Sequence, residues 1–284
     1  MQSDRLLRLP PYLFVEIDRR KAEYVGSGGR VLDLGIGDPD LGAPAIVIER
    51  LKEALGVISH HRYPPGTGLP MLKSAIRDWA GREYGVAPGD DEILVTIGSK
   101  EAIAHLPLAT VDPGSMVLVP DPGYPVYHSS AVFAGADSHR MPLTEVNGFL
   151  PEFSGLDADV RKKARLVYLN YPNNPTAATA GPGFFEEAIG FSRETGSILV
   201  NDAAYSGIVF EGKAEALFPA AIEAGIEYAE LFSFSKTLSI TGWRVGFAIG
   251  SPAVISALGR FKANVDSGVF SAIQEAIARV LDED

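Results

Sequence analysis

The sequence predicts an α/β fold of three layers, in which helices cover both faces of a mostly parallel sheet. Short apolar runs of strand length recur along the chain, and longer amphipathic stretches separate them. Turn-forming residues follow several of these runs directly, as in Asp121-Pro122-Gly123. Strands that alternate with helices in this way are typical of βαβ units, which build a parallel sheet.

The apolar runs define the expected strands, because each is rich in aliphatic residues and is bounded by turn formers. They are EILVTI (92–97), SMVLVP (115–120), ARLVYLNY (164–171), SILVND (197–202), ELFSFS (230–235) and VGFAIG (245–250). Helices are expected among the stretches between them, including 46–58, 69–84, 99–109, 184–195 and 252–263. Ligands of an open parallel sheet collect at the carboxyl ends of its strands, so polar residues directly after these runs are candidates for chemistry.

Composition excludes several classes of function. The chain has 284 residues, of which 46% are hydrophobic and 21% charged, so it can bury a large core and is not intrinsically disordered. A net charge of -11 is the wrong sign for a protein that binds nucleic acid. The lack of cysteine excludes disulfides and a thiol nucleophile. Without a long apolar run or a secretory signal, we expect a cytoplasmic protein and no membrane partner.

One glycine-rich segment is similar to a nucleotide-binding turn but lacks part of the pattern. Residues 31–39 read VLDLGIGDP, like the first strand and turn of a dinucleotide or S-adenosylmethionine site. Pro39 and Asp40 stand where such a site requires a third glycine and the start of a helix. We therefore interpret the segment as a strand followed by a turn.

The segment SFSKTLSITGWRVG (233–246) contains a lysine in unusual company. Taken alone, Lys236 would be read as a solvated surface residue. However, Asp202 ends one apolar run, Tyr205 follows it closely, and Asn174 stands in the turn after another run. Ser99 opens an expected helix after a third. Pyridoxal 5′-phosphate is a cofactor that requires all of these residue types together.

This cofactor needs an amine for its aldehyde, a carboxylate for its ring nitrogen, donors to its phenolate oxygen and a site for its phosphate. Lys236 can supply the amine, Asp202 the carboxylate, and Asn174 and Tyr205 the donors. Backbone N–H groups at a helix start can bind the phosphate. The residues assigned to the phosphate and to the face of the ring are Ser99, Lys100, Ser233, Arg244 and Tyr124.

Each of these side chains also has an ordinary alternative role. A serine can cap a helix, an aspartate or asparagine can stabilise a turn, an arginine can lie on the surface and a tyrosine can belong to the core. Their occurrence together, in this order and at the expected strand ends, favours the cofactor.

The set resembles the class I and II aminotransferases of pyridoxal-phosphate fold type I, from Tyr12 to about Gln274. The resemblance implies that Lys236 is the Schiff-base lysine and that Asp202 and Tyr205 are its catalytic partners. It also implies that Tyr63 reaches the phosphate of a neighbouring subunit, and hence a homodimer with shared active sites. The cofactor contacts that it implies are Ser99, Lys100, Tyr124, Asn174, Asp202, Tyr205, Ser233, Ser235, Lys236, Arg244, Tyr63 and Asn264.

Within this family, the segments PPYLF, LGIGD, GSKEAI, YPNNPTAA and FKANVDSGVF are similar to the LL-diaminopimelate aminotransferases. The likeness implies an exchange of amino groups between LL-diaminopimelate and 2-oxoglutarate, a step of lysine biosynthesis. A broad-range aminotransferase, a β-lyase of the same fold and a cofactor-binding domain without turnover remain alternatives. The substrate contacts implied are Tyr12, Gly37, Lys100, Tyr124, Asn174 and Asn264, the last of these from the partner subunit.

The sequence departs from the family pattern in two places. Ala177 follows Thr176 where most relatives have glycine. The chain stops at Asp284, where the family continues into a small C-terminal domain whose arginine binds the substrate α-carboxylate, so we expect that domain to be absent or truncated. The expected organisation is an N-terminal arm at 1–30, which is part of the small domain, and a large cofactor-binding domain at 31–284.

No metal site is expected. His60 and His61 precede the segment around Tyr63 and have no evident metal partners in the sequence, so we expect both to be surface residues.

Overall fold

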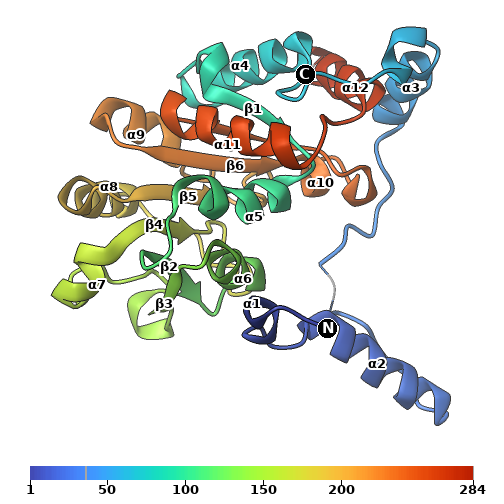
Figure 1. Cartoon of the computed structure of the whole chain (residues 1–284). Coiled ribbons are helices and arrows are strands. Elements are labelled where there is room, and N and C mark those ends of the chain that lie inside the picture. The colour runs from blue at the N-terminus through green and yellow to red at the C-terminus, as the bar shows by residue number, and fades with distance from the viewer. Residues whose placement is uncertain (36, 284) are drawn as a thin grey trace.

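A sheet of seven strands runs through the centre of the molecule in the order β1-β7-β6-β5-β4-β2-β3 (Figure 1). The structure, a computed structural model, describes residues 1–35 and 37–283. Strands β2 to β6 are parallel to one another, whereas β7 is antiparallel to both β6 and β1. The strands are β1 (Ile93–Thr96), β2 (Met116–Asp121), β3 (Asp137–Pro142), β4 (Ala164–Leu169), β5 (Ile198–Asp202), β6 (Tyr228–Ser233) and β7 (Gly246–Gly250).

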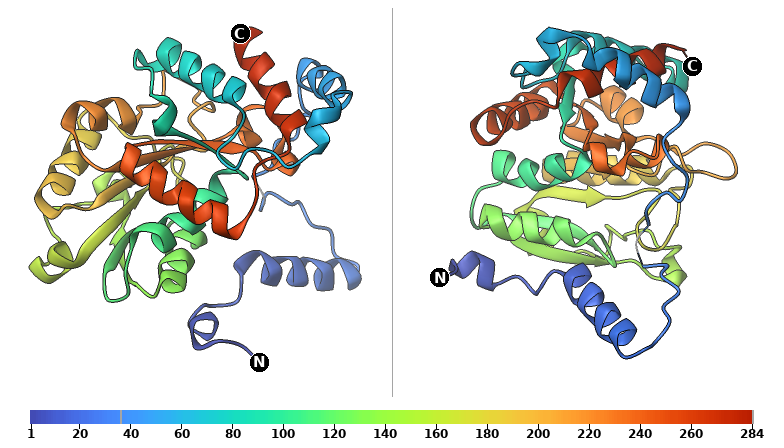
Figure 2. Two further views of the ribbon diagram at one scale, coloured as in Figure 1. Left: turned by 45° about the horizontal axis from the view of Figure 1, so that its top comes forward. Right: turned by 90° about the vertical axis from the view of Figure 1, so that its right-hand side faces the viewer.

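Helices cover both faces of this sheet, because successive residues of a strand point to opposite faces. Leu231 of β6 packs in the core under α5 (Ser99–Thr110), α6 (Pro125–Ala134) and α11 (Pro252–Val265). Its neighbour Phe232 belongs to the core on the opposite face. Figure 2 shows the resulting layers from two further directions, and they confirm the predicted three-layer α/β fold. The helices that contribute to the second core are α3 (Ala45–Leu55), α4 (Pro70–Tyr84), α7 (Ala158–Lys163), α8 (Phe184–Thr195), α9 (Leu217–Ala224), α10 (Phe234–Thr237) and α12 (Ser271–Glu283).

Proline and glycine fix the ends of several helices. Pro70 and Pro125 are the first residues of α4 and α6, where the missing N–H of proline costs nothing. Gly85 and Gly135 follow the same two helices at φ of +74° and +78°, a left-handed conformation that glycine adopts without strain. The helices therefore stop where the sequence supplies these residues, and the chain can turn back into the sheet.

The N-terminal segment lies outside the layers. Neither α1 (Asp4–Leu7) nor α2 (Leu13–Gly26) buries a residue, and both lie beside the sheet and its helices in Figures 1 and 2. Arg5 Nη1 donates a hydrogen bond to the carbonyl oxygen of Phe133 in α6, at 3.1 Å. An irregular connection leads from α2 to α3.

The strand expected in 31–39 is wrong for the described part of that segment, which excludes Ile36. Its residues belong to the irregular connection between α2 and α3 and pair with no strand. Leu32 and Leu34 are 81% and 97% exposed, because no sheet neighbour covers them. An apolar run forms a strand only where another strand is available to accept its backbone hydrogen bonds.

The other expected elements correspond to observed ones within a few residues. Strand β6 begins and ends two residues before the expected 230–235, because residues 234–237 form the short helix α10 (Phe234–Thr237). The edge strand β3 was not expected, since its sequence DSHRMP is polar and only Met141 is buried. The expected helix at 46–58 ends at Leu55, and a 3-10 turn follows at Ile58–His61. Among the described residues, no helix is both long and apolar enough to span a lipid bilayer.

The antiparallel strand β7 determines how the site is assembled. Because β7 runs back beside β6, the connection between them begins and ends at the same edge of the sheet. Ser233 at the end of β6 pairs with Gly246 at the start of β7. Residues 234–245 are therefore held at the edge where the parallel strands end, and this connection carries both Lys236 and Arg244.

Candidate active site

A cavity of ≈ 440 Å³ lies at the carboxyl edge of the parallel strands. Strand ends, helix starts and one segment of the N-terminal connection all reach it, as is usual for ligand sites in open α/β sheets. The residues that line it are Tyr12, Phe14, Gly35, Gly37, Ser99, Lys100, Tyr124, Tyr127, Asn170, Asn174, Asp202, Ala204, Tyr205, Ser233, Ser235, Lys236, Thr241 and Arg244.

A buried carboxylate stands at the floor of the cavity. Asp202, the last residue of β5, is 5% exposed. Its Oδ2 accepts a hydrogen bond from the hydroxyl of Tyr127 at 2.8 Å, whereas its Oδ1 is buried with no partner among the described residues. Burial raises the pKa of Asp202 to about 6, although the bond from Tyr127 and the backbone N–H of Ala204 oppose the shift. A buried acceptor without a donor costs free energy, which a cationic ligand group would recover.

Two asparagines arrange the polar side of the cavity. Asn170, just after β4, donates from Nδ2 to the backbone oxygen of Asp202 at 2.7 Å, and its Oδ1 accepts from the backbone N–H of Asn174. Asn174 Nδ2 lies 3.4 Å from the hydroxyl of Tyr205, a long hydrogen bond. Burial, with a smaller effect of the Asp202 charge, raises the pKa of Tyr205, so its hydroxyl keeps its proton and can act as a donor.

Lys236 lies in α10, directly after β6. Its Nζ donates to the backbone oxygen of Gly37 at 2.5 Å and lies 3.9 Å from Asp38 Oδ1. Partial burial lowers the pKa of Lys236; the nearby Arg244 acts in the same direction, whereas Asp38 opposes it. The amine is thus easier to deprotonate than an ordinary lysine, as a nucleophile or base requires.

Hydrogen-bond donors that could bind an anion lie together at the start of α5. Ser99 is its first residue, and the preceding Gly98 has φ of +71°. A Cβ on Gly98 would lie 2.5 Å from Arg244 Nη2, so only glycine allows the guanidinium to approach this turn. Ser233 caps α10 and lines the same side of the cavity. A helix N-terminus, a hydroxyl and a guanidinium together form a suitable site for a phosphate dianion.

Aromatic rings form another wall. The rings of Tyr124 and Tyr127 meet edge to face with their centroids 5.8 Å apart, and Tyr127 stacks on Tyr168 at 4.9 Å. Burial and the adjacent Tyr12 raise the pKa of Tyr124. At the mouth of the cavity, Lys100 Nζ lies 5.3 Å from the centre of the Tyr12 ring, within the range of a cation–π contact. The N-terminal segment therefore contributes to a site whose other residues lie much further along the chain.

Comparison with known proteins decides the family. The family model for aminotransferases of class I and II matches residues 29–284. The chain belongs to the class I and II aminotransferases. It is therefore an enzyme that moves amino groups between amino acids and oxo acids.

The relatives of this aminotransferase are close in sequence and in structure. The LL-diaminopimelate aminotransferases of Syntrophobacter fumaroxidans and Moorella thermoacetica are 46% and 47% identical to it; the alignments cover 100% and 97% of this chain and 74% and 71% of theirs. Among solved structures, substrate-bound BacF from Bacillus subtilis is 36% identical with a TM-score of 0.93, and the match covers 100% of this chain and 72% of that one.

The structure brings together most of the residues that the sequence singled out in this aminotransferase. All of them line the cavity except Tyr63 and Asn264. Tyr63 is 92% exposed, and Asn264 is an exposed residue near the end of α11 whose Nδ2 donates to Arg260 O at 2.8 Å. Gly37 lines the cavity through its backbone and accepts the bond from Lys236.

Sequence reasoning missed three polar residues of the aminotransferase cavity, Tyr127, Asn170 and Thr241, of which the first two had a signal in the sequence. Tyr127 stands three residues after Tyr124 in DPGYPVY, a helical spacing that places both rings on one side of α6. Asn170 interrupts the apolar run ARLVYLNY near its end, where a polar residue is a signal in itself. Both signals were present in the sequence.

The expectation that His60 lies on the surface is wrong, although His61 is exposed. His60 is 8% exposed, with Nδ1 2.9 Å from the backbone oxygen of Ala54 and Nε2 3.1 Å from Glu275 Oε2. It packs between α3 and α12, and α12 was not among the expected helices, so its partner could not be foreseen.

Proposed function

We propose that this aminotransferase uses pyridoxal 5′-phosphate and that the cavity at the sheet edge holds it. The observation that carries the proposal is the unpartnered Oδ1 of Asp202, buried in the same cavity as the amine of Lys236. When bound, the cofactor supplies an electron sink that makes the α-proton of an amino acid removable. A carboxylate and an amine in one cavity match the ring nitrogen and the aldehyde of this cofactor, respectively.

The remaining residues of the cavity fit the other groups of the cofactor. We assign Asp202 to the ring nitrogen, where ion pairing satisfies Oδ1 and returns the carboxyl to its charged form. Asn174 and Tyr205 are assigned to the phenolate oxygen, since both present donors on that side. Tyr124 provides a ring face. The groups assigned to the phosphate are the start of α5 at Ser99 and Lys100, together with Ser233, Ser235 and Arg244.

Lys236 is assigned the proton transfer. Its lowered pKa favours the neutral amine, whose Nζ could take the α-proton of a bound amino acid and give a proton back. The backbone oxygen of Gly37 accepts a bond from Nζ and so gives the amine a defined direction when it is free. Tyr205 and Asp202 complete the catalytic group, because they would hold the cofactor in the same cavity as Lys236.

For the substrates, we propose LL-diaminopimelate and 2-oxoglutarate. The support is the name shared by the curated relatives from several organisms, all at 42% to 47% identity. In lysine synthesis the reaction would form LL-diaminopimelate from tetrahydrodipicolinate and glutamate. The residues assigned to the substrate are Tyr12, Gly37, Lys100, Tyr124 and Asn174, with Asn264 from a partner subunit.

We further propose a homodimer with shared sites. Tyr63 and Asn264 lie outside the cavity of their own chain and are exposed, so both are free to reach the cavity of a second copy. A symmetric dimer would place two such sites at one interface. For the domains, we propose an arm at 1–30, which bears α1 and α2, and a cofactor-binding body at 31–284.

The substitution Lys236→Ala tests the proposed reaction. We expect it to abolish both transamination of LL-diaminopimelate with 2-oxoglutarate and the visible absorption band of the purified holoenzyme, because no other amine is assigned to that position. The matched control is Lys213→Ala, which removes an exposed lysine paired with Glu83 and should change neither. Transamination by purified Lys236→Ala at the wild-type rate would disprove the assignment.

A further inference from the structure

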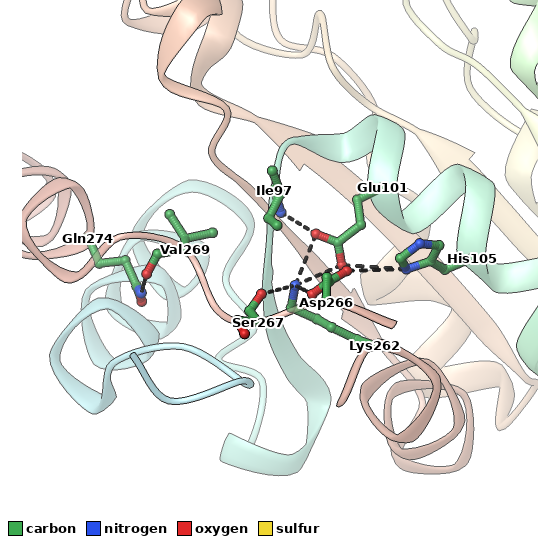
Figure 3. Close-up of polar contacts among 8 residues, drawn as sticks. All are labelled: Ile97, Glu101, His105, Lys262, Asp266, Ser267, Val269 and Gln274. Carbon is green, nitrogen blue, oxygen red and sulfur yellow. Dashed lines mark hydrogen bonds and ion pairs between the residues drawn. The ribbon is translucent and has the colours of Figure 1, made fainter. Parts of the chain in front are cut away.

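A second group of charged side chains lies outside the cavity, between α5 and α11 (Figure 3). Lys262 of α11 is 1% exposed, and its Nζ donates to the two carboxylate oxygens of Glu101 on α5 at 2.9 and 3.0 Å. It also donates to Asp266 Oδ1 at 2.6 Å and to the backbone oxygen of Ser267 at 3.0 Å. Nδ1 of His105, one turn further along α5, lies 3.6 Å from Glu101 Oε1. We call Glu101, His105, Lys262 and Asp266 the Lys262 cluster.

This cluster contains the side chains of a metal site but already holds a cation. Ligand atoms of Glu101, His105 and Asp266 all lie within 4.8 Å of one another. The ammonium of Lys262 contacts both carboxylates of this group and supplies the positive charge that they require. The cluster is therefore better explained by a structural role than by metal binding.

Glu101 joins the cluster to the turn at the start of α5. Its Oε2 accepts a hydrogen bond from the backbone N–H of Ile97 at 2.5 Å (Figure 3). Ile97 lies within this turn, in which Gly98 N donates to Thr96 O at 2.8 Å. A carboxylate held by Lys262 on one side and bonded to Ile97 on the other fixes where the first N–H groups of α5 point. Those N–H groups belong to Ser99 and Lys100, which line the cavity and are assigned to the phosphate.

Lys262 also compensates a negative charge close to that phosphate. Glu101 stands in the first turn of α5, and its side chain is 7% exposed. In such a place water screens little, so a carboxylate without a cation would repel a phosphate dianion bound at the same helix end. The buried ammonium of Lys262 removes this repulsion.

The connection that follows Lys262, from α11 to α12, is itself held by close packing. A Cβ on Gly268 would lie 2.3 Å from the backbone oxygen of Pro65, so the connection from α11 to α12 packs directly against residues 64–65. Gln274 of α12 donates from Nε2 to Val269 O at 2.5 Å and accepts from Leu69 N at 2.7 Å. The position of Lys262 is thus fixed by the surrounding packing.

We propose that Lys262 is a positioning residue for the cofactor phosphate, acting through Glu101 on the turn at 97–100. The proposal rests on the proposed function, since it assumes that this turn binds the phosphate. Lys262 does not line the cavity, so its effect on ligands passes through Glu101 and the backbone.

The test compares two ligands that differ only in the phosphate. Apoenzyme would be titrated with pyridoxal 5′-phosphate and with pyridoxal, and both dissociation constants would be measured by absorption. We expect Lys262→Met to raise the dissociation constant of pyridoxal 5′-phosphate on the order of tenfold and to leave that of pyridoxal within about twofold. The matched control is Lys163→Met, which breaks an exposed pair with Asp159 at the same four-residue spacing and should change neither constant.

Each outcome has a separate meaning. An unchanged affinity for pyridoxal 5′-phosphate, or an equal loss for both ligands, would overturn the role of Lys262 while the proposed function stands. Wild-type apoenzyme that binds neither ligand would overturn the proposed function itself. If Lys262→Met does not fold, Lys262→Gln decides by the same comparison, because it keeps a polar end that can contact Glu101 and removes the compensating positive charge.

Discussion

Asp202 lowers the stability of the folded protein when no ligand is bound, because its carboxylate is buried without a cationic partner in the described part of the chain. Its carboxyl is buried, one oxygen has no hydrogen-bond partner within residues 1–35 and 37–283, and burial raises its pKa from 3.8 to about 6. Because the folded pKa lies above the unfolded one, the contribution of this group to stability is full below about pH 4 and is lost as the pH rises through 6. A cationic group bound at Oδ1 would reverse the effect.

The substitution Asp202→Asn should remove this pH dependence from the cofactor-free protein. We expect the stability of the variant relative to wild type to rise on the order of 1 kcal/mol between pH 5 and pH 8, because the amide never ionises. Urea unfolding of both apoproteins at the two pH values measures it. A stability difference that is the same at pH 5 and pH 8 would contradict the burial of an ionisable Asp202.

Ala177 is a second residue at which the sequence and the backbone conflict. Its φ is +62°, a left-handed conformation that costs free energy for any residue with a Cβ. From the sequence we expect glycine at this position in most relatives. The left-handed backbone gives a physical reason for that preference, because glycine adopts it without strain.

We expect Ala177→Gly to stabilise the protein by about 0.5–1 kcal/mol, since relief of the strain exceeds the added freedom of the unfolded chain. The neighbouring substitution Ala178→Gly is the control: Ala178 is not among the residues with positive φ, so glycine there should destabilise or have no effect. Thermal unfolding of the two variants gives the comparison, and a lower melting temperature for Ala177→Gly would refute the strain.

At the scale of elements, the turn between β1 and α5 depends on a single glycine. Gly98→Ala would add a Cβ 2.5 Å from Arg244 Nη2 and strain a backbone at φ +71°. We expect it to lower stability by about 1–2 kcal/mol and to weaken the binding of pyridoxal 5′-phosphate, because Arg244 must move.

Gly114→Ala provides the control for that substitution. Its φ of +87° creates the same kind of strain, but a Cβ there would meet no atom within 4 Å. Both variants should therefore lose stability in denaturant unfolding, while only Gly98→Ala should lose cofactor affinity in a titration. Equal affinities for the two variants would show that the approach of Arg244 is unimportant.

The sequence could predict elements whose pattern is local. Apolar runs bounded by turn formers located every strand except β3, whose polar sequence fits an edge with only Met141 buried. It could also predict most of the cavity, because polar residues at strand ends converge once the sheet is parallel. The partners of His60, the irregular course of 31–35 and the contact between Lys236 and Gly37 depend on segments far apart in the chain. No local pattern encodes them.

At the scale of the whole molecule, the proposed dimer predicts complementation between two inactive variants. In a mixed dimer of Tyr63→Ala and Lys236→Ala, one site would receive an intact Tyr63 and an intact Lys236, and the other neither. Co-refolding of the two proteins in equal amounts should therefore recover up to about a quarter of wild-type activity, since half of randomly paired dimers are mixed.

Tyr63→Ala alone is expected to bind cofactor weakly, and each variant refolded by itself sets the background. Light scattering of the same samples reports whether dimers form. Mixed samples in which dimers form but activity stays at the background would argue against an active site shared between subunits.

The lining of the cavity comes from the N-terminal segment, from residues at or after the ends of β1, β2, β4 and β5, and from the β6–β7 connection, so that it spans the chain from Tyr12 to Arg244. No single unit of strand and helix contains enough of it to retain a ligand. Under the proposed function, a purified sample would turn yellow only after the full set of strands had paired. Colour in a cell lysate would then serve as an optical measure of how much of the expressed protein has reached its native state.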